Sequence, residues 1–138
     1  MKLVIDASVA LKWILGPLGE PNAQEAGELL SPLRRGDVEL FAPAHWFAEV
    51  VAVVTRQQPD RLEDTLDLLN ALKVEIVNGR NLLTRAAKLS RILDHHLFDT
   101  LYHAVAIEQM ATLITADERY FAKAKELGMI KLLGQEKI

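Results

Sequence analysis

Four acidic residues of this 138-residue chain stand where carboxylates are suited to bind a cation. They are Asp6, Glu49, Asp99 and Asp117. Asp6 follows the apolar run "LVI" and Asp117 follows "TLITA", while Asp99 opens the apolar stretch "DTLYHAVAI". Like charges that converge repel one another strongly unless a cation neutralises them. Carboxylates and hydroxyls in a chain without cysteine suit Mg²⁺ or Mn²⁺ better than zinc.

Each acid also has a structural explanation that the sequence leaves open. Asp6, Asp99 and Asp117 stand where an aspartate would cap a helix. Glu49 is the only charged residue in "WFAEVVAVV", so we expect it on a buried helix. Burying an unpaired carboxylate costs several kcal/mol or more. Glu49 therefore either faces a polar cavity, binds a cation or pairs with an arginine, and we favour a functional site.

Two hydroxyls accompany the acids. Ser8 and Thr115 each lie two residues from an aspartate. They either position a ligand, a water or a phosphate, or serve as ordinary capping hydroxyls. With a divalent cation, such a site polarises a phosphoryl oxygen, activates water and stabilises the leaving oxygen of an in-line displacement.

Short apolar runs alternate with helical patterns along the chain. The expected strands are residues 2–5, 38–42, 74–77, 112–115 and 130–133. The expected helices are 7–15, 23–35 (bent at Pro32), one from Pro43 to about 58, one capped by Asp60, 81–93, 99–110, and 117–127 ended by Gly128. This alternation predicts one α/β domain over residues 1–138, an α/β sandwich with a mostly parallel central sheet flanked by helices. In open sheets of this kind the active crevice lies beyond the carboxyl ends of the strands, where Asp6 and Asp117 fall.

Composition excludes several classes of protein. The chain is 50% hydrophobic and 25% charged and has no cysteine, which excludes a disulfide framework and a thiolate-bound metal. Its apolar stretches are too short to span a membrane, and its first residues read into a strand instead of a signal peptide. We therefore expect a cytoplasmic protein with no membrane association. The net charge of −3 does not indicate a basic nucleic-acid surface, although a cluster of acids would itself lower the total.

Four segments resemble the PIN-domain family of metal-dependent ribonucleases and, within it, the VapC-type toxins of toxin–antitoxin pairs. They are "LVIDASVALKW", "APAHWFAEVVAVV", "LFDTLYHAVAI" and "LITADERYFAKA", which carry the four acids in the family's order. The resemblance implies a PIN-like α/β/α sandwich with Asp6, Glu49, Asp99 and Asp117 as catalytic metal ligands, and Ser8 and Thr115 match its hydroxyls. It also implies Mg²⁺ or Mn²⁺, cleavage of an RNA substrate, a homodimer, and inhibition by a cognate antitoxin in the acidic groove.

Other functions remain as alternatives. A catalytically silent PIN scaffold that binds RNA or protein would keep the same fold, and only the presence of all four acids speaks against it. A phosphoacceptor signalling domain wants paired acids after an early strand, whereas Asp6 stands alone.

Two further groups of residues are weaker candidates for a functional site. His95, His96, Asp99 and His103 would have metal-binding spacing on one helix, but we expect a helix break at His96–Leu97 and a packed or surface His103. The cations Arg85, Lys88 and Arg91 are expected on a solvated helix face.

Overall fold

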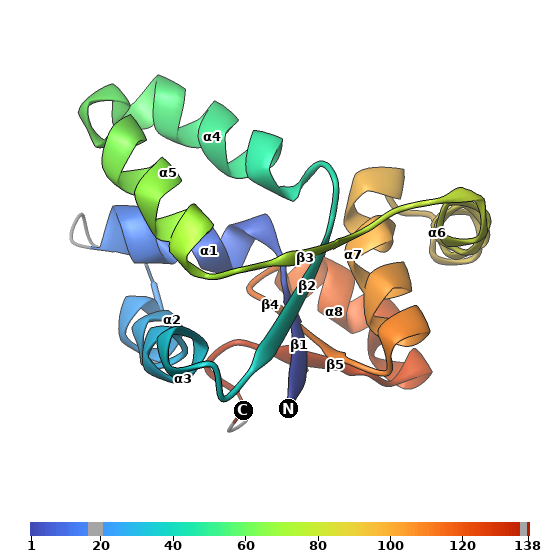
Figure 1. Ribbon diagram of the computed structural model, residues 1–138. Coiled ribbons are helices and arrows are strands. Elements are labelled where there is room, and N and C mark those ends of the chain that lie inside the picture. The colour runs from blue at the N-terminus through green and yellow to red at the C-terminus, as the bar shows by residue number, and fades with distance from the viewer. Residues whose placement is uncertain (17–20, 136–137) are drawn as a thin grey trace.

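Five parallel strands form one sheet in the computed structural model, which describes residues 1–16, 21–135 and 138 (Figure 1). The strands are β1 (Lys2–Ile5), β2 (Glu39–Pro43), β3 (Glu75–Val77), β4 (Thr112–Thr115) and β5 (Ile130–Leu132). Their order across the sheet is β3-β2-β1-β4-β5, and every neighbouring pair is parallel. The predicted parallel sheet is confirmed.

Helices cover both faces of this sheet, which confirms the predicted sandwich (Figure 1). On one side lie α1 (Ala7–Leu15), α2 (Ala23–Glu28), α3 (Leu30–Arg35), α4 (Trp46–Gln57) and α5 (Leu62–Ala71). On the other lie α6 (Arg80–Leu93), α7 (Leu97–Gln109) and α8 (Glu118–Ala124). Two 3₁₀ turns, η2 (Pro59–Arg61) and η3 (Lys125–Leu127), precede α5 and follow α8. Right-handed crossovers explain the division, because the chain moves across the sheet in opposite directions in its two halves.

The strand order reverses between β1 and β4. The chain leaves β1 toward β2 on one side, whereas it leaves β4 toward β5 on the other. The two strands are paired in register, with Ile5 opposite Ile114, and the N–H of Asp6 continues the ladder to the carbonyl of Ile114 at 3.2 Å. Such a switch point leaves a crevice at the carboxyl ends of the strands, which is the usual ligand site of open α/β sheets.

The central strands are buried on both faces, as parallel strands between helices must be. Val4 and Ile5 of β1 and Ile114 of β4 are fully buried. Helix α7 packs against β1, β2 and β4, and its fully buried Ala104 and Ala106 let its backbone come close to the sheet. Burial of one Ile or Val side chain stabilises the fold by about 1.5–3 kcal/mol. The carboxyl ends of β1 and β4 are therefore held in place by the core.

Five local expectations are wrong. The helix expected over 23–35 is two helices, α2 and α3, which break at Leu29 and not at Pro32. Pro43 ends β2 and does not open a helix, because its pairing with Val77 of β3 keeps it in the strand, and α4 begins only at Trp46. Asp60 lies in η2 and does not cap α5, which begins two residues later. Helix α4 is not buried all round: it buries only the stripe Trp46, Val50 and Val54. Helix α7 begins at Leu97 with His96 as its N-cap, so Asp99 lies in the first turn and is not the cap.

No helix in the described part of the chain is long and apolar enough to cross a membrane.

Candidate metal centre

Asp6 ends β1 and begins α1 at the switch point. Its backbone is still extended, and its Oδ1 accepts the N–H groups of Ser8 at 3.0 Å and Val9 at 3.4 Å. The hydroxyl of Ser8 also donates to Oδ1, and the hydroxyl of Thr115 donates to Oδ2 at 2.5 Å. The capping interpretation of Asp6 is therefore confirmed, but a cap needs one hydrogen bond and this carboxylate has four.

The two hydroxyls are fixed by the loop that follows β4. The N–H of Ala116 donates to Ser8 Oγ at 3.1 Å, and the N–H of Asp117 donates to Thr115 Oγ1 at 3.0 Å. A hydroxyl that accepts from one backbone group is free to donate its only proton to another acceptor. Ser8 and Thr115 therefore tie the β1–α1 and β4–α8 loops together through Asp6.

The pKa of Asp6 is raised to about 6: burial is the largest cause and the nearby charge of Asp99 adds to it, while the hydrogen bonds from Ser8, Thr115 and Val9 oppose the rise. At neutral pH the carboxylate is thus ionised in a place that disfavours its charge. A cation bound beside it would relieve that cost.

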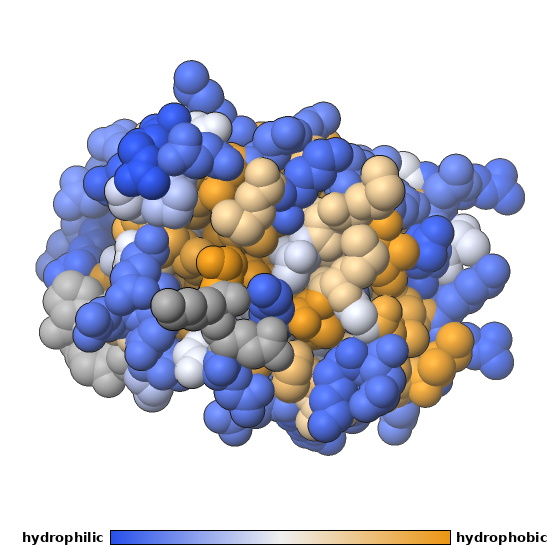
Figure 2. Space-filling view, turned by 90° about the horizontal axis from the view of Figure 1, so that it is seen from below, coloured by the Kyte–Doolittle hydropathy of each residue, from blue (hydrophilic) through white to orange (hydrophobic). Residues whose placement is uncertain are grey.

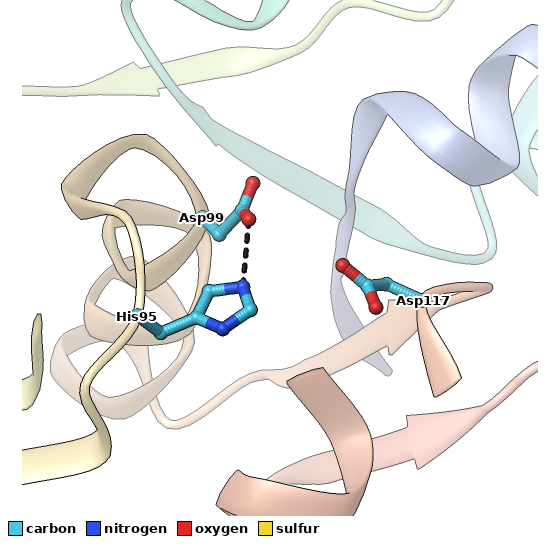
Figure 3. A group of neighbouring side chains, drawn as sticks. All are labelled: His95, Asp99 and Asp117. Carbon is cyan, nitrogen blue, oxygen red and sulfur yellow. Dashed lines mark hydrogen bonds and ion pairs between the residues drawn. The ribbon is translucent and has the colours of Figure 1, made fainter. Parts of the chain in front are cut away.

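The side chains of Asp117 and Asp99 come from different elements and lie near each other, with His95 beside Asp99 (Figure 3). Asp117 is the N-cap of α8 and accepts the N–H of Tyr120 at 3.0 Å. Asp99 accepts a hydrogen bond from Nε2 of His95 at 2.8 Å. Ligand atoms of His95, Asp99 and Asp117 all lie within 4.8 Å of one another, which is close enough to share one ion.

Glu49 lies in the first turn of α4, the helix on the other face of the sheet from α7 and α8 (Figure 1). Its Oε2 accepts the phenol proton of Tyr102 at 3.1 Å. Nε2 of His45 is 3.2 Å from Oε1, but the two are poorly aligned, and this buried nitrogen makes no hydrogen bond among the described residues. The Glu49 side chain is 37% exposed, so it lies at the surface and not in the core.

Two tyrosines report how the acids are grouped. Burial raises the pKa of Tyr120, and the charges of Asp99, Asp6 and Asp117 raise it further. Burial likewise raises the pKa of Tyr102, followed by the charges of Glu49 and Asp6. The three aspartates therefore lie near Tyr120, whereas Glu49 lies near Tyr102, and Asp6 is close to both tyrosines. Among the described residues, Asp6 and Glu49 are outside the group of ligand atoms within 4.8 Å.

His95 was set aside in the sequence because a helix break was expected between it and Asp99. The predicted break is confirmed, because α6 ends at Leu93 and α7 begins at Leu97. His95 nevertheless reaches Asp99 from the connection between the helices, and the spacing of four residues was the available signal. His103 is fully buried between the Tyr120 hydroxyl and the carbonyl of Gly128, each at 2.9 Å, and so is structural.

The donor set fits a hard divalent cation. Carboxylate oxygens dominate it, and in the described part of the chain none of the four acids has an ion pair with lysine or arginine. Oxygen ligands of this kind suit Mg²⁺ or Mn²⁺. The arrangement is chemically able to hold such an ion next to a phosphodiester.

Comparison with known proteins identifies relatives at the level of family and fold. The family model described as "PIN domain" matches residues 3–127. No curated protein matches the chain. A solved structure titled "Crystal structure of VapBC2 from Rickettsia felis bound to a DNA fragment from their promoter" is similar in fold, with a TM-score of 0.69 and 18% sequence identity over 96% of this chain and 97% of that one.

Proposed function

Because the chain belongs to the PIN domain family, we propose that it is a metal-dependent endoribonuclease and the toxin of a toxin–antitoxin pair. Residues 1–138 would be a single nuclease domain. The observation that carries the proposal is the approach of Asp99 and Asp117, whose ligand atoms lie within 4.8 Å of each other and of His95. Asp6 stands beside them, because the hydroxyl of Thr115 ties it to the loop that carries Asp117. PIN domains are generally nucleases that use divalent metals, and the donor set meets that need.

Asp6, Glu49, Asp99 and Asp117 would hold Mg²⁺ or Mn²⁺. When bound, such an ion polarises a phosphoryl oxygen, activates a water and stabilises the leaving oxygen. Ser8 and Thr115 keep both oxygens of Asp6 in place and so hold that ligand rigid. Glu49, which accepts the hydroxyl proton of Tyr102, would complete the set of metal ligands from the α4 side.

An antitoxin is the expected protein partner. The similar structure is, by its title, a VapBC2 complex on promoter DNA, which supports an antitoxin as the partner of this chain. An acidic crevice attracts a cation, so an arginine or lysine of the antitoxin would take the place of the metal and form charge-assisted hydrogen bonds. A neighbouring reading frame that encodes a small protein with such a basic segment would support this part of the proposal.

The apolar surfaces of α1 and α4 would form two interfaces, one for self-association and one for an antitoxin segment. Part of the α1 surface is already used, because Trp13 donates its indole N–H to the carbonyl of Ala26 at 2.7 Å. The partly buried Leu11, Phe47 and Val53 remain near the surface. A monomer by light scattering at micromolar concentration would contradict a homodimer.

Asp117→Asn tests the proposal at one residue. Asparagine caps a helix about as well as aspartate, so a residue that only caps α8 would lose little stability and no activity. As a metal ligand, Asp117 should be irreplaceable: we expect RNA cleavage to fall by more than about 100-fold, beyond the loss typical of an outer partner. Thermal melts with chelator should match the parent or rise, since one repelling carboxylate is gone.

The control is Asp64→Asn, which removes an exposed acid from the first turn of α5. It should leave cleavage unchanged. Undiminished cleavage by Asp117→Asn would leave Asp117 with a capping role alone. A parent protein that never cleaves RNA with either metal would favour the silent scaffold instead.

A further inference from the structure

We propose that His95 is a positioning residue that holds the carboxylate of Asp99 for the metal, and that Lys123 fixes the proton of His95 on the nitrogen facing Asp99. The proposal rests on the proposed function, because it takes Asp99 as a metal ligand. It assigns a role to two residues, on the α6–α7 connection and on α8, that neither the sequence motifs nor the family match singles out.

His95 holds the carboxylate of Asp99 through a hydrogen bond. Nε2 of His95 lies 2.8 Å from Oδ2 of Asp99, while the second oxygen of that carboxylate points away from the ring (Figure 3). The His95 side chain is 7% exposed, whereas that of Asp99 is 39% exposed. A half-exposed carboxylate with no partner would rotate freely. The buried ring restricts it to one orientation.

Lys123 determines the tautomer of the His95 ring. Nδ1 of His95 lies 3.3 Å from Nζ of Lys123, which also donates to the carbonyl of Asp94 at 2.6 Å. An ammonium group has donors only, so Nδ1 accepts and the ring proton is on Nε2. That proton is donated to Asp99. The three side chains thus form a directed chain from Lys123 through His95 to Asp99.

The His95 ring is itself held in place by its neighbours. The hydroxyl of Ser90 donates to the carbonyl of His95 at 2.5 Å, and the N–H of His95 donates to the carbonyl of Ser90 at 3.1 Å. The ring also packs edge-on against Tyr120, with centroids 4.9 Å apart. The adjacent His96 is exposed and makes no side-chain capping bond. Only His95 of this pair is held so that it can orient a neighbour.

These contacts favour a positioning role over direct binding of the metal. One ring nitrogen uses its proton on Asp99, and the lone pair of the other faces Lys123. Neither nitrogen therefore offers a lone pair toward the crevice. Partners that orient a metal ligand in this way typically contribute 10–100-fold to metal affinity.

Calorimetric titration with Mg²⁺ and with Mn²⁺, in the absence of RNA, tests the proposal. His95→Leu should raise the Kd of both metals by about 10–100-fold and by similar factors. His95→Gln can place an amide donor where Nε2 lies, and so should recover most of the affinity. His96→Leu is the matched control and should bind both metals like the parent.

Several outcomes would overturn the proposal. Equal affinities of His95→Leu and His96→Leu would show that the contact does nothing for the metal. A loss confined to Mn²⁺, with no recovery in His95→Gln, would make His95 a direct ligand. A lower melting temperature of His95→Leu with an unchanged Kd would make its role structural. Failure of the nuclease proposal is seen separately, as a parent that binds metal but does not cleave RNA.

The nitrogen-15 spectrum of the metal-free protein tests the part played by Lys123. In the parent, His95 should show a protonated Nε2 and an unprotonated Nδ1. Lys123→Met should shift the ring toward a mixture of tautomers and weaken metal binding less than His95→Leu does. A parent spectrum with the proton on Nδ1 would contradict the directed chain.

Discussion

The two sides of the crevice are built to different degrees of rigidity. On the sheet side, both oxygens of Asp6 are held by hydroxyls that are themselves held by backbone N–H groups. On the α4 side, Glu49 is 37% exposed, accepts one hydrogen bond from Tyr102 and stands beside an unaligned His45. One acid is fixed before any ligand arrives, and the other is free to adjust.

The difference shows which of the acids the fold holds in place before a ligand binds. Asp6 sits at the junction of two buried strands, so its geometry follows from the core, and its burial raises its pKa to about 6. Glu49 sits on a helix of which only one stripe is buried, so its position depends on α4 as a whole. We infer that Asp6 sets the place of the metal and that Glu49 completes its surroundings.

The largest effect is expected from Asp6→Asn. The amide oxygen can keep the cap, but the amide carries no charge and its nitrogen cannot accept the hydroxyl proton of Thr115. Cleavage should therefore fall by more than about 100-fold, as for loss of a direct ligand. The metal-free protein should become more stable at pH 7, because a folded-state pKa of about 6 against 3.8 in the unfolded chain corresponds to about 3 kcal/mol as an upper value. Urea melts with chelator measure this, with Asp64→Asn as control. A destabilised Asp6→Asn protein would contradict the strained-charge account.

A smaller effect is expected from Glu49→Gln. Since its side chain is partly exposed and adjustable, cleavage should fall by about 10–100-fold, and the unfolding free energy should change by less than about 0.5 kcal/mol. Steady-state cleavage and melts are compared with those of Glu63→Gln, which alters an exposed acid of α5. Equal losses of cleavage in Glu49→Gln and Asp6→Asn would show that the two sides are equally preorganised.

The smallest effect is expected from pH. The pKa of Asp6 is raised, so the metal-free carboxyl takes up a proton as the pH falls through about 6. The folded state thus gains relative stability from this group at low pH and loses it as pH rises through about 6. A cation competes with that proton, so Mg²⁺ affinity should fall below pH 6 by up to about ten-fold per pH unit. Calorimetry from pH 5 to 7.5 measures it, and a flat affinity would contradict the raised pKa.

Much of the fold could be predicted from the sequence, because buried parallel strands leave short β-branched runs such as "KLVI" and "TLIT". Element ends were harder. A proline at position 43 is compatible with a strand end or a helix start, and tertiary pairing with Val77 decides between them. The start of α7 was set two residues late, since Leu97 and Phe98 carry no helix-start signal.

The candidate site was predictable by type but not by contact. The acids stood out because charges interrupt apolar runs, and the parallel topology placed Asp6 and Asp117 at one edge. No local pattern shows that Ser8 and Thr115 both donate to the same carboxylate, because that needs the pairing of β1 with β4. His95 was named but set aside for the same reason, since its contacts with Tyr120 and Lys123 join segments far apart in the chain.

The most direct test of the account is cleavage of a mixed RNA pool by the purified protein, with Mg²⁺ or Mn²⁺ and with excess chelator. We expect cleavage with either ion, none with chelator, and recovery when metal is restored. Cleavage that persists undiminished in chelator would contradict a metal centre built from these carboxylates.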